Sequence, residues 1–290
     1  MQDFSIVTDS SCDLPPRMAQ QMGLTVLPLT FRLQGRDYQN WLDGREMSFE
    51  EFYLHIRQGE PCTTSAVNVE RFTAGIEALL RRGQDVLCIC FSSGLSNTYN
   101  AARMACASLA PRYPGRTLRV VDTLAASLGQ GLLIWHAARL RGEGMDAGAV
   151  ADWIEENKLH LCHWFTVDDL NYLRRGGRIS GATALLGTML NIKPVLHMDN
   201  AGHLVSVGKA RGRRRALDAL VSHMAQTAIE PEKQMVFISH CDARQDAAYV
   251  AQAVREKLGV PRTVLNFVGP VIGAHAGPGT VALFFLGTER

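Results

Sequence analysis

The chain has 290 residues, of which 47% are hydrophobic and 20% are charged, and its formal net charge at pH 7 is +2. This composition is typical of a globular protein and excludes a disordered or fibrous chain. The small net charge argues against a protein that binds bulk nucleic acid, because such proteins carry a larger basic excess. The length allows two domains or one large α/β domain.

The seven cysteines are scattered and include no Cys-x-x-Cys pair. We therefore expect neither a disulfide framework nor a zinc site. The first apolar stretch, Phe4–Val7, lacks the basic start and the length of a signal peptide. No window offers the roughly 18 uncharged apolar residues of a membrane-spanning helix. The sequence thus predicts a cytoplasmic protein without a bound metal or other cofactor.

The first half of the sequence alternates between strand and helix patterns. Four apolar runs of strand length are Phe4–Asp9, Leu24–Phe31, Asp85–Phe91 and Leu118–Val121. Helical spacing of apolar residues follows at Ser48–Ile56, Ala101–Ala110, Leu124–Arg141 and Ala147–Asn157. The third strand is apolar on both faces, so the alternation predicts a parallel sheet covered by helices.

After Asn157 the pattern changes to a hairpin followed by a second set of strands and helices. The predicted strands are 161–167, 190–197, 204–207, 235–240 and 263–267, and an apolar strand ends the chain. We therefore predict an α/β fold with two domains. The N-terminal α/β domain would span residues 1–157 and contain the parallel sheet, and the C-terminal α/β domain would span residues 158–290.

Two clusters of hydroxyl residues precede predicted helices in the first half. Thr64 and Ser65 belong to one, and Ser93 and Ser96 lie in the turn that follows the strand 85–91. Hydroxyl residues at such positions most often cap the next helix. Two clusters at one edge of a sheet could also converge on an anion, which neutral donors and helix dipoles would bind. The sequence leaves both interpretations open.

A stretch rich in glycine and proline surrounds His275. Four glycines and two prolines fall within residues 269–279, and an apolar run follows. This composition predicts a constrained loop that holds His275 in front of a buried strand. Such a histidine either bonds a backbone carbonyl or belongs to a functional site.

A serine hydrolase is the alternative function that the motifs suggest. The segment Gly94–Thr98 matches the nucleophile turn of such enzymes except that Thr98 occupies the position of the second glycine. In that interpretation Ser96 is the nucleophile, His275 is the base, and Asp9 or Asp122 orients the histidine.

Basic residues gather in two segments of the second half. Arg178 follows Gly177, and a glycine there would let a phosphate or a partner approach closely. Arg213–Arg215 open a predicted helix and are best interpreted as a solvated face. A nucleic-acid surface over Arg211–Arg215 is the other interpretation, and the low net charge argues against it.

Taken together and in order, these motifs resemble those of the DegV family, bacterial fatty acid-binding proteins that serve as the binding subunit of fatty acid kinase. Each segment is a weak signal alone, and their number and order carry the resemblance. The matching segments are Thr8–Leu14, Thr64–Ser65, Ser92–Tyr99, Val121–Asp122, Gly176–Ser180, Leu190–Val195, Ala210–Arg211 and Gly269–Phe285.

The resemblance implies a two-domain α/β protein that holds one long-chain fatty acid, such as palmitate, stearate or oleate, in a tunnel. The head-group site would lie at the cleft between the domains. It implies that Thr64 and Ser96 bind the carboxylate and that Ser65, Ser93 and His275 belong to the same site.

The resemblance also implies that this chain is not itself an enzyme. A separate kinase subunit would phosphorylate the bound fatty acid to an acyl phosphate, which agrees with the lack of an ATP-phosphate loop in this sequence. Arg178 and Arg211 would contact that kinase or the acyl phosphate. A transient contact with a membrane fits this function, and no nucleic-acid partner is expected.

Overall fold

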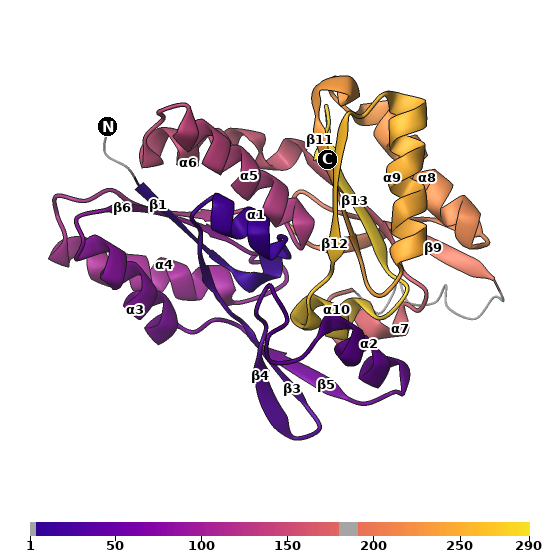
Figure 1. Ribbon diagram of the computed structural model, residues 1–290, viewed down its shortest axis with the longest axis horizontal. Coiled ribbons are helices and arrows are strands. Elements are labelled where there is room, and N and C mark those ends of the chain that lie inside the picture. The colour runs from indigo at the N-terminus through magenta and orange to yellow at the C-terminus, as the bar shows by residue number, and fades with distance from the viewer. Residues whose placement is uncertain (1–3, 180–190) are drawn as a thin grey trace.

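The computed structural model describes residues 4–179 and 191–290 (Figure 1). Its strands form a four-stranded, a six-stranded and a three-stranded sheet, and helices cover them, which confirms the α/β class. Ser180 and Leu190, at the ends of two motifs named above, lie outside the described residues. The domain boundary after residue 157 stays a prediction.

The four-stranded sheet is parallel throughout, as its apolar strands predict. The strand order is β2-β1-β6-β7, and the central strand β6 is buried at every residue. The strands are β1 (Phe4–Asp9), β2 (Thr25–Leu27), β6 (Asp85–Cys90) and β7 (Leu118–Asp122).

Side chains of β6 alternate between two hydrophobic clusters, one on each face of the sheet. Cys88 and Cys90 pack in the cluster that contains α3 and α4, whereas Leu87 and Ile89 pack in the cluster of α5 and α6. The helices of this half are α1 (Pro16–Gln21), α3 (Val69–Leu80), α4 (Thr98–Leu109), α5 (Leu128–Gly142) and α6 (Ala147–Asn157).

The three-stranded sheet is antiparallel, with the order β4-β3-β5. The expectation of one strand over residues 24–31 is wrong, because the chain leaves the parallel sheet after Leu27 and begins β3 at Thr30. Pro28 lies in the gap and has no N–H group to continue a ladder. The elements of this part are β3 (Thr30–Leu33), β4 (Arg36–Gln39), α2 (Phe49–Arg57) and β5 (Cys62–Ser65).

The six-stranded sheet is mixed, with the order β10-β9-β8-β13-β11-β12. Only the pair β11–β12 is parallel among its described strands. The predicted hairpin forms from β9 and β10. The strands are β8 (Leu161–Thr166), β9 (Ile192–Met198), β10 (Leu204–Arg211), β11 (Met235–His240), β12 (Arg262–Phe267) and β13 (Val281–Leu286).

Helices cover both faces of this sheet as well. Leu283 and Phe285 of β13 pack in the cluster of α8 and α9, and Phe284 between them packs in the cluster of α5. The remaining helices are α7 (Asn171–Arg175), α8 (Arg213–Thr227), α9 (Arg244–Leu258) and α10 (Pro270–Ala276). Short 3-10 turns lie at Ser10–Cys12, Ala110–Arg112, Lys158–His160 and Pro231–Lys233.

Helix α5 lies between the parallel sheet and the six-stranded sheet (Figure 1). Residues 128–134 at its start are all buried, so the helix has no solvent face there. Two glycines allow this close packing. A Cβ atom on Gly129 would stand 2.2 Å from the His163 ring, and one on Gly131 would stand 2.9 Å from the carbonyl oxygen of Cys12.

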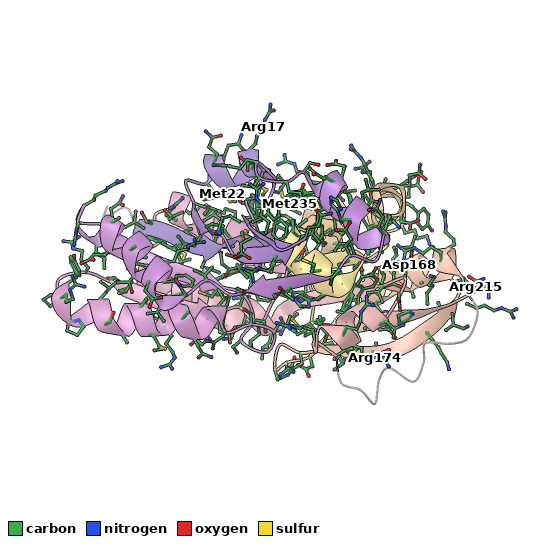
Figure 2. All side chains as sticks on the ribbon, turned by 90° about the horizontal axis from the view of Figure 1, so that it is seen from below. Arg17, Met22, Asp168, Arg174, Arg215 and Met235 are labelled. Atoms are coloured by element: carbon green, nitrogen blue, oxygen red, sulfur yellow. The ribbon has the colours of Figure 1, made fainter. Side chains whose placement is uncertain are left out.

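Of the three arginines at the start of α8, Arg214 and Arg215 are exposed, as their position predicts, whereas Arg213 is half-buried and paired. The Arg213 guanidinium lies 2.8 Å from the Asp246 carboxylate, and Arg214 stacks on the Tyr249 ring. Arg215 is exposed, and Figure 2 shows it at one end of the molecule. None of the described helices is long and apolar enough to cross a membrane.

The contact of α5 with His163 gives a test of the packing. Gly129→Ala should lower the free energy of unfolding by about 2 kcal/mol, because the added methyl group overlaps the His163 and Phe284 rings. Gly142→Ala is the matched control at the end of the same helix, where a Cβ atom meets nothing within 4 Å. It should leave stability unchanged or raise it slightly. Urea unfolding measures both, and equal effects would contradict the packing.

Candidate functional site

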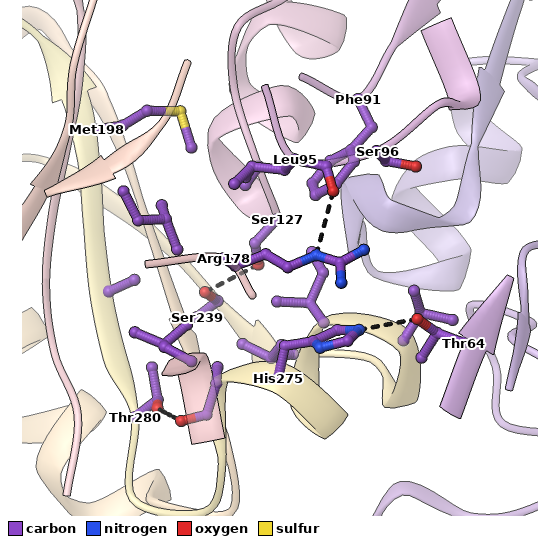
Figure 3. Close-up of a pocket in the computed structure, with 18 of the residues that line it drawn as sticks. Thr64, Phe91, Leu95, Ser96, Ser127, Arg178, Met198, Ser239, His275 and Thr280 are labelled. Atoms are coloured by element: carbon purple, nitrogen blue, oxygen red, sulfur yellow. Dashed lines mark hydrogen bonds between the residues drawn. The ribbon is translucent and has the colours of Figure 1, made fainter. Parts of the chain in front are cut away.

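An apolar cavity of about 280 Å³ lies where the two halves of the chain meet (Figure 3). Strand ends and loops of the first half and the six-stranded sheet and α10 of the second half contribute to its wall. Its apolar lining includes Leu29, Phe91, Leu95, Ala126, Phe165, Met198, Val271, Ile272, Ala282 and Phe284.

Four polar side chains from four separate segments line the same cavity. They are Thr64 of β5, Ser96 before α4, Arg178 after α7 and His275 of α10. The Thr64 hydroxyl oxygen lies 2.8 Å from Nε2 of His275, although the two residues are 211 positions apart in the chain. Figure 3 shows the Arg178 guanidinium beside this pair. Thr64, Arg178 and His275 thus lie together in one part of the wall, and other polar residues, among them Ser127, Ser239 and Thr280, lie elsewhere among the apolar lining.

His275 lies on a helix, which corrects the expectation of a loop over residues 269–279. Gly269 is the N-cap of α10, Pro270 occupies its first turn, and the helix ends before Gly277, which has a φ of 78°. Gly273 is needed for packing, because a Cβ atom there would stand 2.4 Å from the Tyr53 hydroxyl of α2. The glycines and the proline therefore build a short, closely packed helix with the histidine in its last turn.

The His275 side chain is half-buried and has a low proton affinity. Burial, and secondly the nearby Arg178 charge, lower the pKa of His275 to about 4. At neutral pH the ring is uncharged and has one donor and one acceptor nitrogen. A Cβ atom on Gly176 would stand 2.2 Å from Nδ1, so the absence of a side chain at Gly176 lets the ring approach the backbone.

Thr64 and Ser65 are strand residues rather than helix caps. They end β5, and Asn68 caps α3 by accepting a 2.9 Å hydrogen bond from the Arg71 N–H. Both hydroxyl residues line the cavity, Thr64 half-buried and Ser65 exposed. The Thr64 hydroxyl is therefore available to the cavity and to His275.

Ser96 and Ser93 occupy different environments although both lie in the turn after β6. Ser96 lines the cavity, and its hydroxyl oxygen accepts from the Thr98 N–H at 3.2 Å in the first turn of α4. Ser93 does not line the cavity. Its side chain is exposed, and its N–H donates to the Asp122 carboxylate. The sequence motif includes Ser93, but the structure places it outside this site.

The triad of a serine hydrolase is not assembled. His275 bonds Thr64 rather than Ser96, and no carboxylate contacts His275 among residues 4–179 and 191–290. Asp9 is buried under the sheet edge and accepts from two backbone N–H groups and the Gln130 amide. Asp122 accepts from two backbone N–H groups. The interpretation of Ser96 as an activated nucleophile is therefore wrong.

The two arginines named from the sequence also differ in their positions. Arg178 lines the cavity, donates to the Leu95 carbonyl oxygen at 3.2 Å, and has no acidic partner within the described chain. Burial lowers the pKa of the Arg178 guanidinium. Arg211 ends β10, is exposed, and does not line the cavity. Of these two arginines, Arg178 is therefore the one that brings a positive charge to Thr64 and His275.

A second, more polar cavity of about 450 Å³ adjoins the first. Thr64, Arg178 and His275 line both cavities, so these three side chains stand between the apolar space and a polar one. Arg175 lines the second cavity only. Within the described part of the chain, no group of three or more His, Cys, Asp or Glu side chains is arranged to hold a metal ion.

Comparison with known proteins agrees with this architecture. A family model described as an uncharacterised protein of the DegV family matches residues 3–288. The chain belongs to the DegV family. A DegV domain-containing protein of Clostridium perfringens is 40% identical over 290 residues, which cover all of this chain and 99% of that protein.

Solved structures of DegV-family proteins have the same fold. A protein from Thermotoga maritima, described as a DegV lipid-binding protein, is 28% identical with a TM-score of 0.87 and covers 99% of each chain. One from Thermus thermophilus, whose structure is described under fatty acid binding, is 32% identical with a TM-score of 0.85. That match covers 97% of this chain and 98% of the other.

The low pKa of His275 predicts a pH dependence of stability. Unfolded histidine has a pKa near 6.5, so between pH 6.5 and about 4 the unfolded state binds more protons than the folded state. Stability should therefore fall as the pH falls through this window. His275→Gln should remove about 2 kcal/mol of the loss between about pH 7 and about pH 5. Urea unfolding at both pH values measures this, and identical losses in wild type and variant would contradict it.

Proposed function

We propose that this DegV-family protein binds one long-chain fatty acid, with the acyl chain in the apolar cavity and the carboxylate at Thr64, Ser96, Arg178 and His275. The observation that carries the proposal is an apolar cavity lined by Thr64, Ser96 and His275 together with the Arg178 guanidinium, which has no acidic partner among the described residues. The described lipid and fatty acid binding of the Thermotoga and Thermus relatives supports it.

Burial of the acyl chain provides most of the binding free energy. About 15 methylene groups at ~0.8 kcal/mol each correspond to roughly 12 kcal/mol before the costs of ordering and association. The carboxylate contributes specificity rather than driving force, because removing a charge from water is costly unless donors replace the water. The hydroxyl groups and the guanidinium of the site are such donors.

The uncharged His275 ring fits a role in orienting Thr64. If the ring hydrogen is on Nε2, the ring donates to the Thr64 oxygen across the 2.8 Å contact. The Thr64 hydroxyl hydrogen is then free to point at the carboxylate. Arg178 supplies the compensating charge from the other side. The binding site thus uses one cation and otherwise neutral donors.

We further propose that the bound carboxylate is presented to a separate kinase subunit, which converts it to an acyl phosphate. This chain has no ATP-phosphate loop, so the phosphoryl chemistry would belong to the partner. The polar cavity that shares Thr64, Arg178 and His275 with the apolar one gives a route by which a phosphoryl donor reaches the carboxylate. The protein would act in the cytoplasm, with transient membrane contact to exchange lipid.

Removal of single hydroxyl groups tests the head-group site. Thr64→Val and Ser96→Ala should each weaken palmitate binding about tenfold or more, because each removes a hydrogen bond to a charged group. Ser93→Ala is the matched control, since Ser93 lies in the same turn as Ser96 but outside the cavity. Isothermal titration calorimetry of delipidated protein measures all three. Equal affinities for Ser93→Ala and Ser96→Ala would exclude Ser96 from the site.

Charge reversal tests the kinase contact. Arg211→Glu should leave palmitate binding unchanged, because Arg211 does not line the cavity, and should slow acyl phosphate formation in an assay with ATP and a fatty acid kinase. Arg17→Glu is the matched control: Arg17 is also exposed, on α1, and lies apart from Arg215 and Arg174 in Figure 2. An unchanged rate for Arg211→Glu would remove this arginine from the kinase contact.

A further inference from the structure

Three buried polar groups are connected in series in the wall of the apolar cavity. The Ser127 hydroxyl lies 2.6 Å from a carboxyl oxygen of Asp13 and 3.0 Å from the Ser239 hydroxyl. The exposed fractions are 3% for Asp13, 5% for Ser127 and 0% for Ser239. Ser127 and Ser239 line the cavity, and Figure 3 shows them apart from the Thr64–His275 pair. We call Asp13, Ser127 and Ser239 the relay.

The stability of α5 does not explain the direction of the Ser127 hydroxyl. Ser127 occupies the N-cap position of α5, where a serine normally accepts from the helix backbone, yet it makes no capping bond. Its hydroxyl lies instead against Asp13 and Ser239. Both Ser127 and Asp13 also have positive φ values, of 53° and 49°. Such strain in two bonded, non-glycine residues is typical of functional sites.

The carboxyl group of Asp13 is fixed by the C-terminal half of the chain. One of its oxygens accepts from the Gly269 N–H at 2.9 Å, and the other is bonded to Ser127. The Asp13 carbonyl oxygen accepts from the Asn266 amide at 2.8 Å. Hydrogen bonds therefore hold Asp13, the first residue of the relay, in place. The last residue, Ser239, lies on the buried strand β11.

A count of hydrogens shows what Ser239 offers to the cavity. Ser127 has one hydroxyl hydrogen, and when Asp13 is ionised this hydrogen is donated to the carboxylate. Ser127 is placed to donate to Ser239 as well, but its single hydrogen cannot serve both contacts. With Asp13 ionised, the hydrogen of the 3.0 Å contact is therefore supplied by Ser239. The two lone pairs of the Ser239 oxygen then have no donor among the described residues. An acceptor thus faces the cavity at a place apart from the Thr64–His275 pair.

We propose that the relay is a second polar subsite, which recognises a hydroxyl group on the acyl chain of the bound fatty acid. A plain methylene chain passes Ser239 without pairing its oxygen, whereas a hydroxyl group placed there donates to it. A second carboxylate would be repelled by ionised Asp13, and an oxo group has no hydrogen to donate. The preferred ligand class is therefore a long-chain hydroxy fatty acid. This inference rests on the proposed fatty acid-binding function.

The protonation state of Asp13 sets which groups donate and which accept in the two hydrogen bonds of the relay. Burial raises the pKa of Asp13 to about 7. The other titratable groups near it are Asp9 and Cys12 of its own segment, Tyr53 of α2 and Cys241 after β11. The pKa values of the two thiols and of Tyr53 are raised, so these groups keep their protons at about pH 8.5.

The substitution Asp13→Asn should reverse the donor and acceptor roles of Ser127 and Ser239. An asparagine amide that accepts from Gly269 places its NH₂ group against Ser127, so Ser127 then donates to Ser239 and Ser239 donates into the cavity. In this variant an oxo group can accept from Ser239. In the wild-type protein with ionised Asp13, Ser239 is not such a donor, because its hydrogen is directed to Ser127. A switch of preference from a hydroxy to an oxo fatty acid therefore tests the direction of the hydrogen bonds in the relay. A variant that merely enlarged the cavity or made it more polar would not produce this switch.

The experiment measures the affinity of the protein for two series of fatty acids by their competition with stearate. One series is hydroxystearates and the other is oxostearates, and in each the oxygen is moved to successive positions of the chain. At about pH 8.5, wild type should bind one hydroxystearate isomer about tenfold more tightly than the others and should show no favoured oxostearate. Ser239→Ala should lose the preference for that isomer. Asp13→Asn should gain a favoured oxostearate at the same position.

The outcomes separate the two proposals. Equal binding of all hydroxystearate isomers by a wild-type protein that binds stearate would overturn the relay while leaving fatty acid binding intact. A preference that survives both Ser239→Ala and Ser127→Ala would also overturn it. Failure of wild type to bind stearate or any isomer would instead contradict the proposed function itself. Asp13→Asn gives an independent readout if the serine variants fold poorly.

Discussion

The structure depends on the packing of α5 between two sheets. The parallel sheet and the six-stranded sheet share this helix as a common layer, and its first turns are buried on every side. Gly129 and Gly131 make the approach possible, since side chains there would overlap His163 and the Cys12 backbone. Ala126 and Ser127, which directly precede this helix, line the cavity. The same constraint thus fixes the core and the position of the binding space.

Much of this architecture could be predicted from the sequence, because buried parallel strands and helices carry strong periodic signals. β6 and the hairpin β9–β10 are where their apolar patterns place them. The predictions are wrong where the local sequence is compatible with two conformations. Glycine and proline around His275 are compatible with a loop or a tightly packed helix, and only contact with Tyr53 of α2 selects the helix. Similarly, the strand pairing of Thr64 with Phe31 overrides a capping role.

The candidate site was partly visible in the sequence. Thr64, Ser96 and His275 line one cavity, but Ser93, from the same motif as Ser96, points elsewhere. A motif gives the order of residues and not the direction of their side chains. Ser127 and Ser239 were missed because a serine in a turn or in a buried strand is common, and their connection through Asp13 exists only in three dimensions. A polar residue inside the apolar run of β11 was the one available signal.

The central claim is that the apolar cavity holds a single fatty acid with its carboxylate at Thr64 and Arg178. Native mass spectrometry of the protein purified from cells tests this most directly, because it weighs the protein together with any bound lipid. The account predicts a major species heavier than the bare chain by the mass of one long-chain fatty acid, which denaturing extraction then releases. A bare chain, both as purified and after incubation with palmitate or oleate, would contradict the account.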